Sequence, residues 1–308
     1  MTITDVARHE VSGRSVEPAL SDIRGRTFRR WHTMRYDCYS DAELLGMRDD
    51  LLDHLGARTV SDPYLVTDPA PLVLRTAAEC ALGHLDLGCF PNGDQEIRFP
   101  LIGESVSSED TAFADAVEHA ATAADWLDAF ALGLISGLLW ERDRVIGLLL
   151  RDDHAPAIRD GAPYSELESV SDPGELAEMD TLACYLTRAS GHLPRDWPSV
   201  PLCMPEVDER LDGALRLNAL ADMTPDQRLL RVLLEDDQPA FEQALADRLA
   251  QHRESTPADA PPRSLLPYRT IALAALAVQV HGWDLRVRSG YLPQALLTAP
   301  AGAPAVGR

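Results

Sequence analysis

The chain has 308 residues, enough to bury a large apolar core, and its 49 acidic and 28 basic side chains give a formal net charge of -21. This charge disfavours nucleic acid and anionic membrane surfaces as partners and suits a basic protein partner. All 28 basic residues are Arg. Because there is no Lys, Schiff-base catalysis and a P-loop lysine are both excluded.

The five cysteines are widely spaced and include no Cys-x-x-Cys pair, so we expect neither a zinc site nor a disulfide framework. The motifs GxGxxG, GKS/T, HExxH and GxSxG are absent. They are the usual signatures of nucleotide, metal and acyl-transfer sites. The sequence therefore predicts no cofactor and no metal ion.

Residues 1–10, MTITDVARHE, carry charges and contain no apolar run, so a signal peptide is not expected. Residues 129–140 are uncharged, but they are fewer than the roughly 20 residues that a membrane-spanning helix needs. We therefore expect a cytoplasmic protein with no contact to a membrane.

Apolar residues recur at helical spacing along most of the chain, which predicts a mainly α fold, a bundle or array of about ten helices. Residues 1–14 are expected to form a flexible arm, residues 15–295 a single helical domain, and residues 296–308 a disordered tail. A possible internal boundary lies at residues 152–164, which are rich in Asp, Pro and Gly and are expected to form a loop. The expected helices cover residues 16–31, 40–56, 70–84, 113–121, 129–140, 143–150, 171–186, 205–220, 224–233, 239–253 and 264–281.

One small β-hairpin is expected near residues 85–100. Leu85-Asp86-Leu87 and Ile97-Arg98-Phe99 each alternate between apolar and charged residues, as strands with one buried face do. Asn92-Gly93 lies between them and is a strong signal for a hairpin turn.

The segment from Asp125 to Arg151 contains a long apolar run and is expected to form the centre of the core. Gly133 and Gly137 lie four residues apart, which places them on one face of the expected helix. Two glycines in that arrangement permit a neighbouring backbone to approach closely.

Asp128 lies at the start of this run and is expected to point partly into the interior, where a carboxylate needs a partner. Arg142 and Arg144 are the expected partners. They flank Asp143, which is expected to cap a second helix after a corner that starts at Glu141. The cluster is either an ion-pair network that fixes the register of the helices or a binding or catalytic site.

A second charged feature lies in residues 16–31. This segment contains the only concentrated basic patch of the chain, formed by Arg24, Arg26, Arg29 and Arg30. An Arg cluster beside Trp31 can bind phosphate. In so acidic a protein we expect these side chains to pair with internal carboxylates.

Three segments resemble, in the same order, parts of a bacterial immunity-protein family. The first is Ala124-Asp125-Trp126-Leu127-Asp128-Ala129-Phe130 with the following residues 141–144; the second is Leu230-Arg231-Val232-Leu233 with residues 237–245; the third is residues 265–293, which end in Gly282-Trp283-Asp284-Leu285-Arg286-Val287-Arg288-Ser289-Gly290-Tyr291-Leu292-Pro293. The sequence from about residue 85 onward is therefore similar to immunity protein family 49, which bacteria carry in polymorphic toxin systems. Gly290 is a difference, because members of the family often have Asp at this place.

The resemblance implies a helical antidote that neutralises a cognate, basic toxin by protein-protein contact. The candidate binding residues lie in the resembling segments and are Trp126, Glu141, Asp143, Trp283 and Tyr291. If a partner contacts the Asp that relatives carry in place of Gly290, this chain lacks that contact.

The alternative is a cofactor-independent enzyme, or one subunit of an enzyme pair, in a natural-product pathway. Asp128 would act as general base, and Arg142 or Arg144 would hold an anionic leaving group such as sulfate or phosphate during elimination or ring closure. A helical scaffold with neither role is a third possibility.

Overall fold

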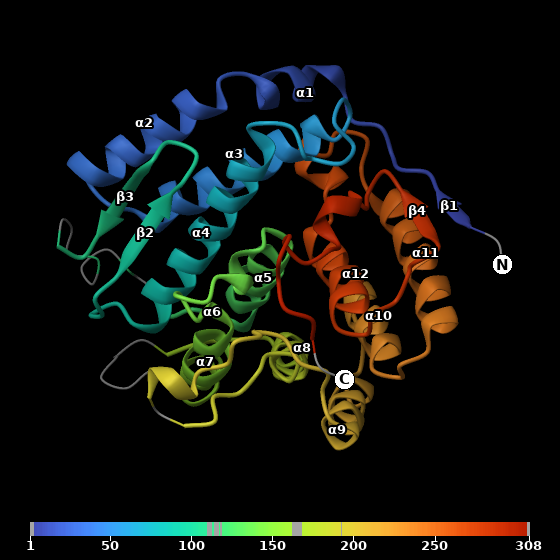
Figure 1. Cartoon of the computed structure of the whole chain (residues 1–308). Coiled ribbons are helices and arrows are strands. Elements are labelled where there is room, and N and C mark those ends of the chain that lie inside the picture. Colours follow the sequence, from blue (N-terminus) through green and yellow to red (C-terminus); the bar gives the residue numbers. More distant parts are fainter. Residues whose placement is uncertain are drawn as a thin grey trace.

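The computed structural model describes residues 3–109, 113, 117, 119–161, 168–191 and 193–306 (Figure 1). Most of these residues lie in α-helices, so the predicted mainly α fold is confirmed. The helices are α1 Gly13–Leu20, α2 Ile23–Tyr36, α3 Asp41–Arg58, α4 Ala70–Cys89, α5 Ala123–Ile135, α6 Ile146–Leu149, α7 Ala155–Asp160, α8 Pro173–Ala183, α9 Val207–Asn218, α10 Pro225–Leu233, α11 Gln238–Ser255 and α12 Tyr268–Gln279. Of the expected helix at residues 113–121, residues 114–116 and 118 are outside the described residues.

The strands form two small sheets. Strands β1 (Thr4–Val6) and β4 (Val287–Ser289) pair in parallel, so the two ends of the chain meet. Strands β2 (Glu96–Phe99) and β3 (Glu104–Ser107) form an antiparallel hairpin. The expected hairpin therefore exists, but its boundaries were wrong. Residues 85–87 belong to α4, because Leu85 and Leu87 are both fully buried within that helix.

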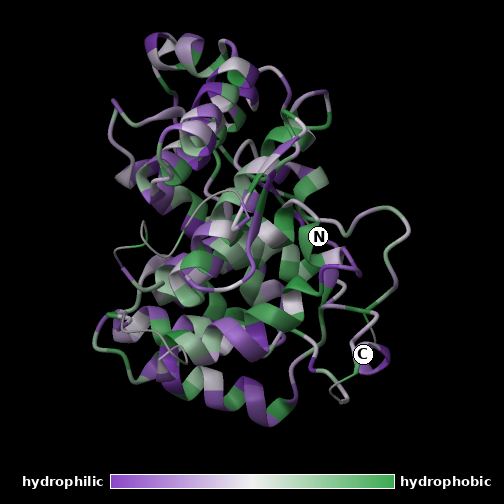
Figure 2. Cartoon of the chain, turned by 90° about the vertical axis from the view of Figure 1, so that its left-hand side faces the viewer, coloured by the Kyte–Doolittle hydropathy of each residue, from purple (hydrophilic) through white to green (hydrophobic). Residues whose placement is uncertain are grey.

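Helix α5 lies near the centre of the molecule, with α3, α4 and the β2–β3 hairpin on one side and α10, α11 and α12 on the other (Figure 1). It packs against α4, α8 and α12. Its first turn is fixed by a capping box, in which Thr122 and Asp125 each bond to the backbone of the other. The Trp126 indole stacks on Phe130 and donates a 2.8 Å hydrogen bond to the Leu150 carbonyl oxygen. Hydrophobic residues gather in these central helices, as Figure 2 shows.

Helix α5 is shorter than the sequence predicts. It ends at Ile135, and Gly137 follows in the left-handed region with φ of 81°, which terminates the helix. A Cβ atom on Gly133 would lie 3.4 Å from the Leu139 side chain, so this glycine faces a side chain and not a second backbone. The prediction of a two-glycine helix face was therefore wrong.

Two other boundaries also differ from the prediction. The expected helix 16–31 is divided into α1 and α2, because Asp22 adopts a left-handed conformation with φ of 38°. The expected loop at residues 152–164 contains instead a π-helical turn, Leu150–His154, followed by α7. Residues 162–167 of this range are outside the described part of the chain.

Both termini contact the folded chain. At the N-terminus the Arg8 guanidinium donates a 2.8 Å hydrogen bond to Oγ1 of Thr59, and the His9 amide donates one of 2.9 Å to the Tyr291 hydroxyl. At the C-terminus Val306 packs against the core. Within the described residues no helix is both long enough and apolar enough to span a bilayer.

Candidate protein-binding surface

The Asp128 carboxylate lies between three helices. Its Oδ2 atom accepts a 3.1 Å hydrogen bond from Arg48 of α3. Its Oδ1 atom accepts bonds of 2.9 Å from the Tyr268 hydroxyl and 2.7 Å from Arg269, both of α12. The side chain is 13% exposed. This geometry joins α3, α5 and α12 through one buried anion.

The predicted pairing of Asp128 with Arg142 or Arg144 was wrong. Asp128 lies near the start of α5, whereas the two arginines follow its other end. Arg144 forms an ion pair with Glu79 of α4, and Arg142 is exposed. The three residues of the enzymatic alternative are therefore not assembled into one site.

A cavity of about 350 Å³ lies close to Asp128 without including it. Tyr268 and Arg269, which bind the carboxylate, line the cavity together with Arg248 and His252. Asp128 itself does not line this cavity. Its arrangement supports a structural role.

The corner after α5 is anchored to α4 by two ion pairs. Glu141 accepts a bond from Arg75, and Arg144 pairs with Glu79, which is 2% exposed. Burial raises the pKa of Glu79, although its bond to Arg144 acts in the opposite direction. Asp143 is exposed and does not cap a helix, since α6 begins only at Ile146.

The aromatic candidates belong mainly to the core. Trp126 and Tyr291 have no exposed surface. Trp283 is partly buried, with its ring centroid 4.5 Å from that of His281 and 5.5 Å from that of Phe241. Of the five predicted binding residues, only Asp143 is exposed and Glu141 and Trp283 are partly exposed. The five therefore do not form a common surface.

A different surface lies on α9, which stands at the lower edge of the molecule (Figure 1). Val207, Leu211 and Leu215 follow one another at intervals of four residues and are 59%, 57% and 66% exposed. We call these three side chains the α9 stripe. Their spacing is that of a buried helix face, but of the large apolar residues of α9 only Leu217 is buried.

The packed face of α9 is formed by smaller residues. Gly213 approaches α8 so closely that a Cβ atom there would lie 2.9 Å from Cγ2 of Thr181. Ala214 and Leu217 are buried beside it. The adjacent Gly213 and Ala214 are the sequence signal for this face, and helical spacing of large apolar residues alone selects the wrong side of the helix.

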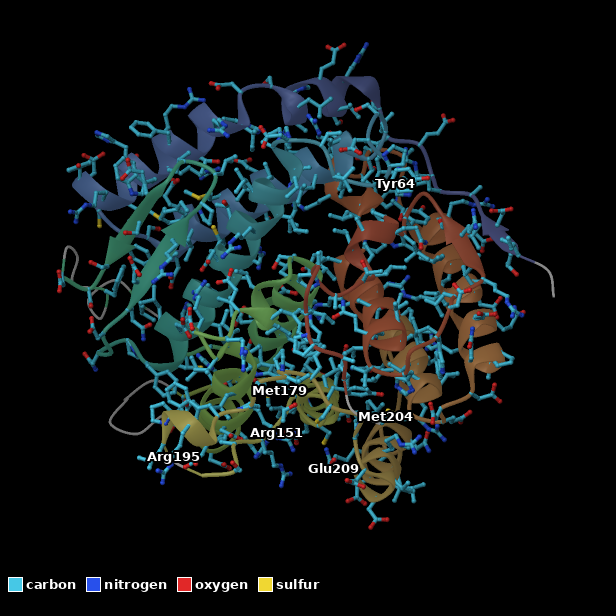
Figure 3. The ribbon with its side chains drawn as sticks, viewed as in Figure 1. Tyr64, Arg151, Met179, Arg195, Met204 and Glu209 are labelled. Carbon is cyan, nitrogen blue, oxygen red and sulfur yellow. The ribbon has the colours of Figure 1, made fainter. Side chains whose placement is uncertain are left out.

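Carboxylates border the α9 stripe. Glu206, Asp208 and Asp212 are exposed next to it. Glu209 lies 3.4 Å from Arg151, which is labelled with it in Figure 3, and 3.3 Å from Arg188. An apolar centre with a charged rim is the usual anatomy of a protein-protein interface.

A cavity of about 550 Å³ adjoins α9 and is lined by four arginines: Arg151, Arg159, Arg188 and Arg216. Three carboxylates offset most of this charge: Asp152 and Asp180 also line the cavity, and Asp180 pairs with Arg159, while Glu209 pairs with Arg151 and Arg188. The cavity therefore has little excess positive charge for an anion. In the described part of the chain no group of three or more metal-ligating side chains is found.

A comparison with protein families places most of the chain in a family. The model of the family described as Immunity protein 49 (Imm49) matches residues 72–296. The chain belongs to the Imm49 family. Asp128, Tyr268, Arg269 and the α9 stripe lie inside the Imm49 match, whereas Arg48 precedes it, as do α1, α2 and the rest of α3. No curated protein and no solved structure matches the chain.

Proposed function

We propose that this Imm49 protein neutralises a cognate, basic toxin domain by binding it through the α9 stripe and its carboxylate rim. Membership of the Imm49 family supports the immunity role. The observation that carries the choice of surface is the exposure of Val207, Leu211 and Leu215 in one line. We place this activity in the cytoplasm, where the five free cysteines would stay reduced.

The apolar part of the surface contributes to the affinity for the toxin. Large apolar side chains that are more than half exposed gain free energy when a partner covers them, on the order of 2 kcal/mol each. Three such side chains in a row match the way a helix anchors in a groove of its partner, through residues one turn apart.

The charged part of the surface accelerates association with the toxin and selects a basic partner. A net charge of -21 attracts a basic domain over long range, and the rim formed by Glu206, Asp208 and Asp212 directs it to α9. Nucleic acid and anionic membranes are repelled by the same charges. A protein partner with an apolar groove among Arg and Lys side chains fits both features.

The experiment is coexpression of the tagged protein with the neighbouring genes of its operon, followed by purification and a growth-rescue assay. A basic toxin domain should copurify in stoichiometric amount, and the wild-type protein should rescue growth. Leu211→Ala/Leu215→Ala should lose the complex and the rescue. Val60→Ala/Val66→Ala is the matched control, because these side chains are 56% and 58% exposed on the segment after α3.

Two outcomes would refute the proposal. If no toxic protein copurifies and the chain rescues no neighbouring toxin, the immunity function is wrong. If the toxin copurifies equally well with the Leu211→Ala/Leu215→Ala variant, neutralisation by contact stands and the choice of α9 is wrong.

A further inference from the structure

Helix α2 presents an exposed row of aromatic side chains. Phe28 is 45% exposed, Tyr36 is 63% exposed, and His32 between them is exposed as well. The ring centroids of Phe28 and His32 are 6.3 Å apart, and those of His32 and Tyr36 are 4.8 Å apart. The three rings therefore form one continuous aromatic ridge, two helical turns long.

Arginines border this ridge. Arg24 and Arg29 are exposed and have no carboxylate within ion-pair distance among the described residues. Arg35 lies with its guanidinium carbon 5.8 Å from the centre of the Tyr36 ring. We call the three rings and these arginines the α2 face. Exposed aromatic and Arg side chains are the residue types that contribute most binding energy at protein interfaces.

The other arginines of the patch point inward. Arg30 lies 2.7 Å from Glu43 and 2.9 Å from Asp50, and Arg26 lies 3.8 Å from Asp50. Internal pairing thus accounts for Arg26 and Arg30. It leaves Arg24 and Arg29 on the outer side of the helix, in a chain whose overall charge is strongly negative.

The α9 stripe and its carboxylate rim, together called the α9 face, are complementary to the α2 face. One has aromatic side chains at positions 28, 32 and 36 with arginines around them, and the other has aliphatic side chains at positions 207, 211 and 215 with carboxylates around them. Both rows have the same four-residue spacing and the same length. They lie at opposite ends of the molecule, α2 at the upper left and α9 at the lower edge of Figure 1, so they meet only between two copies.

We propose that the α2 face of one copy binds the α9 face of a second copy, which gives weak head-to-tail self-association. Pairing of two α2 faces would bring Arg24 and Arg29 against each other, and pairing of two α9 faces would do the same with Asp208 and Asp212. The mixed pair places Arg24 and Arg29 of one copy opposite Asp208 and Asp212 of the other. Because the two contacting surfaces differ, each added copy leaves one of each exposed, and the association continues beyond a dimer.

The association is weak because it rests on a single pair of short helices. Two helices of this length bury less than the roughly 1,200 Å² that stable interfaces require. A consequence, which rests on the function proposed above, is that a toxin would compete with self-association for α9. The α2 helix lies outside the Imm49 match, so this contact is a property of the present chain beyond what the family defines.

The test uses the purified protein alone, in sedimentation velocity over the micromolar to millimolar range. The weight-average mass should rise with concentration and pass the dimer without a plateau, and added salt should reduce it. Arg24→Glu/Arg29→Glu removes the α2 face, and Leu211→Ala/Leu215→Ala removes the α9 face. Each variant alone should associate about tenfold more weakly than wild type or not at all.

An equimolar mixture of the two variants is decisive. Each variant retains the face that the other lacks, so the mixture should form a 1:1 dimer and nothing larger. Arg253→Glu/Arg288→Glu is the matched charge control, since both residues are exposed elsewhere on α11 and β4, and it should associate like wild type. Circular dichroism checks that all variants are folded.

A wild-type protein that stays monomeric, a variant that self-associates unchanged, or a variant mixture that stays monomeric would each overturn the inference. The toxin-binding assay separates this failure from that of the proposed function. If Arg24→Glu/Arg29→Glu binds toxin normally while no self-association occurs, only the head-to-tail contact is wrong. If self-association follows the expected pattern while no toxin is bound, only the proposed function is wrong.

Discussion

Nη1 of Arg48, on α3, lies 3.1 Å from Oδ2 of Asp128, on α5. Arg269, on α12, lies 2.7 Å from the other carboxylate oxygen. A single carboxylate thus holds two guanidinium groups from helices on opposite sides of α5. Burial lowers the pKa of both arginines, whereas the negative charge of Asp128 raises it. The net result is a raised pKa for each.

Replacing this carboxylate should destabilise the fold strongly. Asp128→Ala leaves Arg48 and Arg269 without their common anion, and we expect the free energy of unfolding to fall by about 3–5 kcal/mol. Asp128→Asn should cost less, because the amide oxygen still accepts a hydrogen bond. Denaturant unfolding measures both. Asp143→Ala, at an exposed carboxylate, should change stability by no more than about 0.5 kcal/mol. An Asp128→Ala variant as stable as this control would show that the cluster contributes nothing to the fold.

A histidine between two carboxylates should make stability fall in alkaline solution. His84 of α4 lies 3.7 Å from Asp41 and 3.4 Å from Asp125. Burial alone would lower the pKa of His84, but the nearby carboxylates of Asp125 and Asp41 outweigh this effect and raise the pKa to about 9. The unfolded value is near 6.5, so the protonated histidine stabilises the folded state fully below about pH 6.5.

This stabilisation is lost as the pH rises through about 9. We expect wild type to exceed His84→Gln in unfolding free energy by on the order of 3 kcal/mol near pH 6, and the difference to shrink toward zero near pH 10. Denaturant unfolding of both proteins across this range is the measurement. A difference that does not depend on pH would contradict the assignment.

Glu178 of α8 should likewise make the folded state less stable as the pH rises, but in a lower pH range than His84. It is 5% exposed, and burial raises its pKa to about 7, against the opposing charge of Arg269. A carboxyl group with a raised pKa favours the folded state below its unfolded pKa of about 4.5 and loses this advantage as the pH rises through 7. Glu178→Gln stays neutral throughout. The variant should match wild type near pH 4.5 and exceed it by on the order of 2–3 kcal/mol at pH 8. Equal stability of the two proteins at both pH values would refute a buried, titrating Glu178.

Local signals in the sequence predict the helices of the second half well. Thr224-Pro225-Asp226-Gln227 predicts a capped helix start, and α10 begins at Pro225 with Thr224 as its cap. Asp237 likewise caps α11. These elements depend on bonds between residues that are near one another in sequence, which is why the sequence alone specifies them.

The site could not be predicted in the same way. Arg48 and Asp128 are 80 residues apart, and nothing in the pattern of either helix selects the other as its neighbour. On α9 the pattern misleads, because Val207, Leu211 and Leu215 have the spacing of a buried stripe while the helix packs through Gly213. An exposed apolar stripe and a buried one have the same spacing, so the spacing does not distinguish them; the small residues Gly213 and Ala214, which pack against α8, do.

One close backbone contact should tolerate no side chain. A Cβ atom on Gly56 of α3 would lie 2.0 Å from the carbonyl oxygen of Pro262, in the 3₁₀ turn Pro262–Leu265. Since backbone atoms cannot move aside cheaply, Gly56→Ala should lower the free energy of unfolding by about 2 kcal/mol or more. Gly13→Ala is the control, because a Cβ atom there meets nothing within 4 Å. Thermal or denaturant unfolding compares them, and equal stability of the two variants would rule out the close approach.

The stripe and the rim of α9 should affect different rate constants of toxin binding. Asp208→Asn/Asp212→Asn removes charges that attract a basic partner over distance, so we expect association to slow several-fold and to depend less on salt, with little change in dissociation. Leu211→Ala/Leu215→Ala removes contacts that exist only in the complex, so dissociation should accelerate by about tenfold or more while association stays close to wild type. Surface plasmon resonance with the copurified toxin domain measures both rates at two salt concentrations.

Glu254→Gln/Asp259→Asn provides the charge control, because both residues are exposed on and after α11, away from α9. It changes the net charge by the same amount as Asp208→Asn/Asp212→Asn. Equal slowing by the two double variants would mean that the total charge of the chain steers the toxin and that the rim gives no direction. Slowing by the α9 variant alone would locate the encounter at α9, because beyond the Debye length, about 8 Å at physiological salt, exposed charges elsewhere on the surface are largely screened.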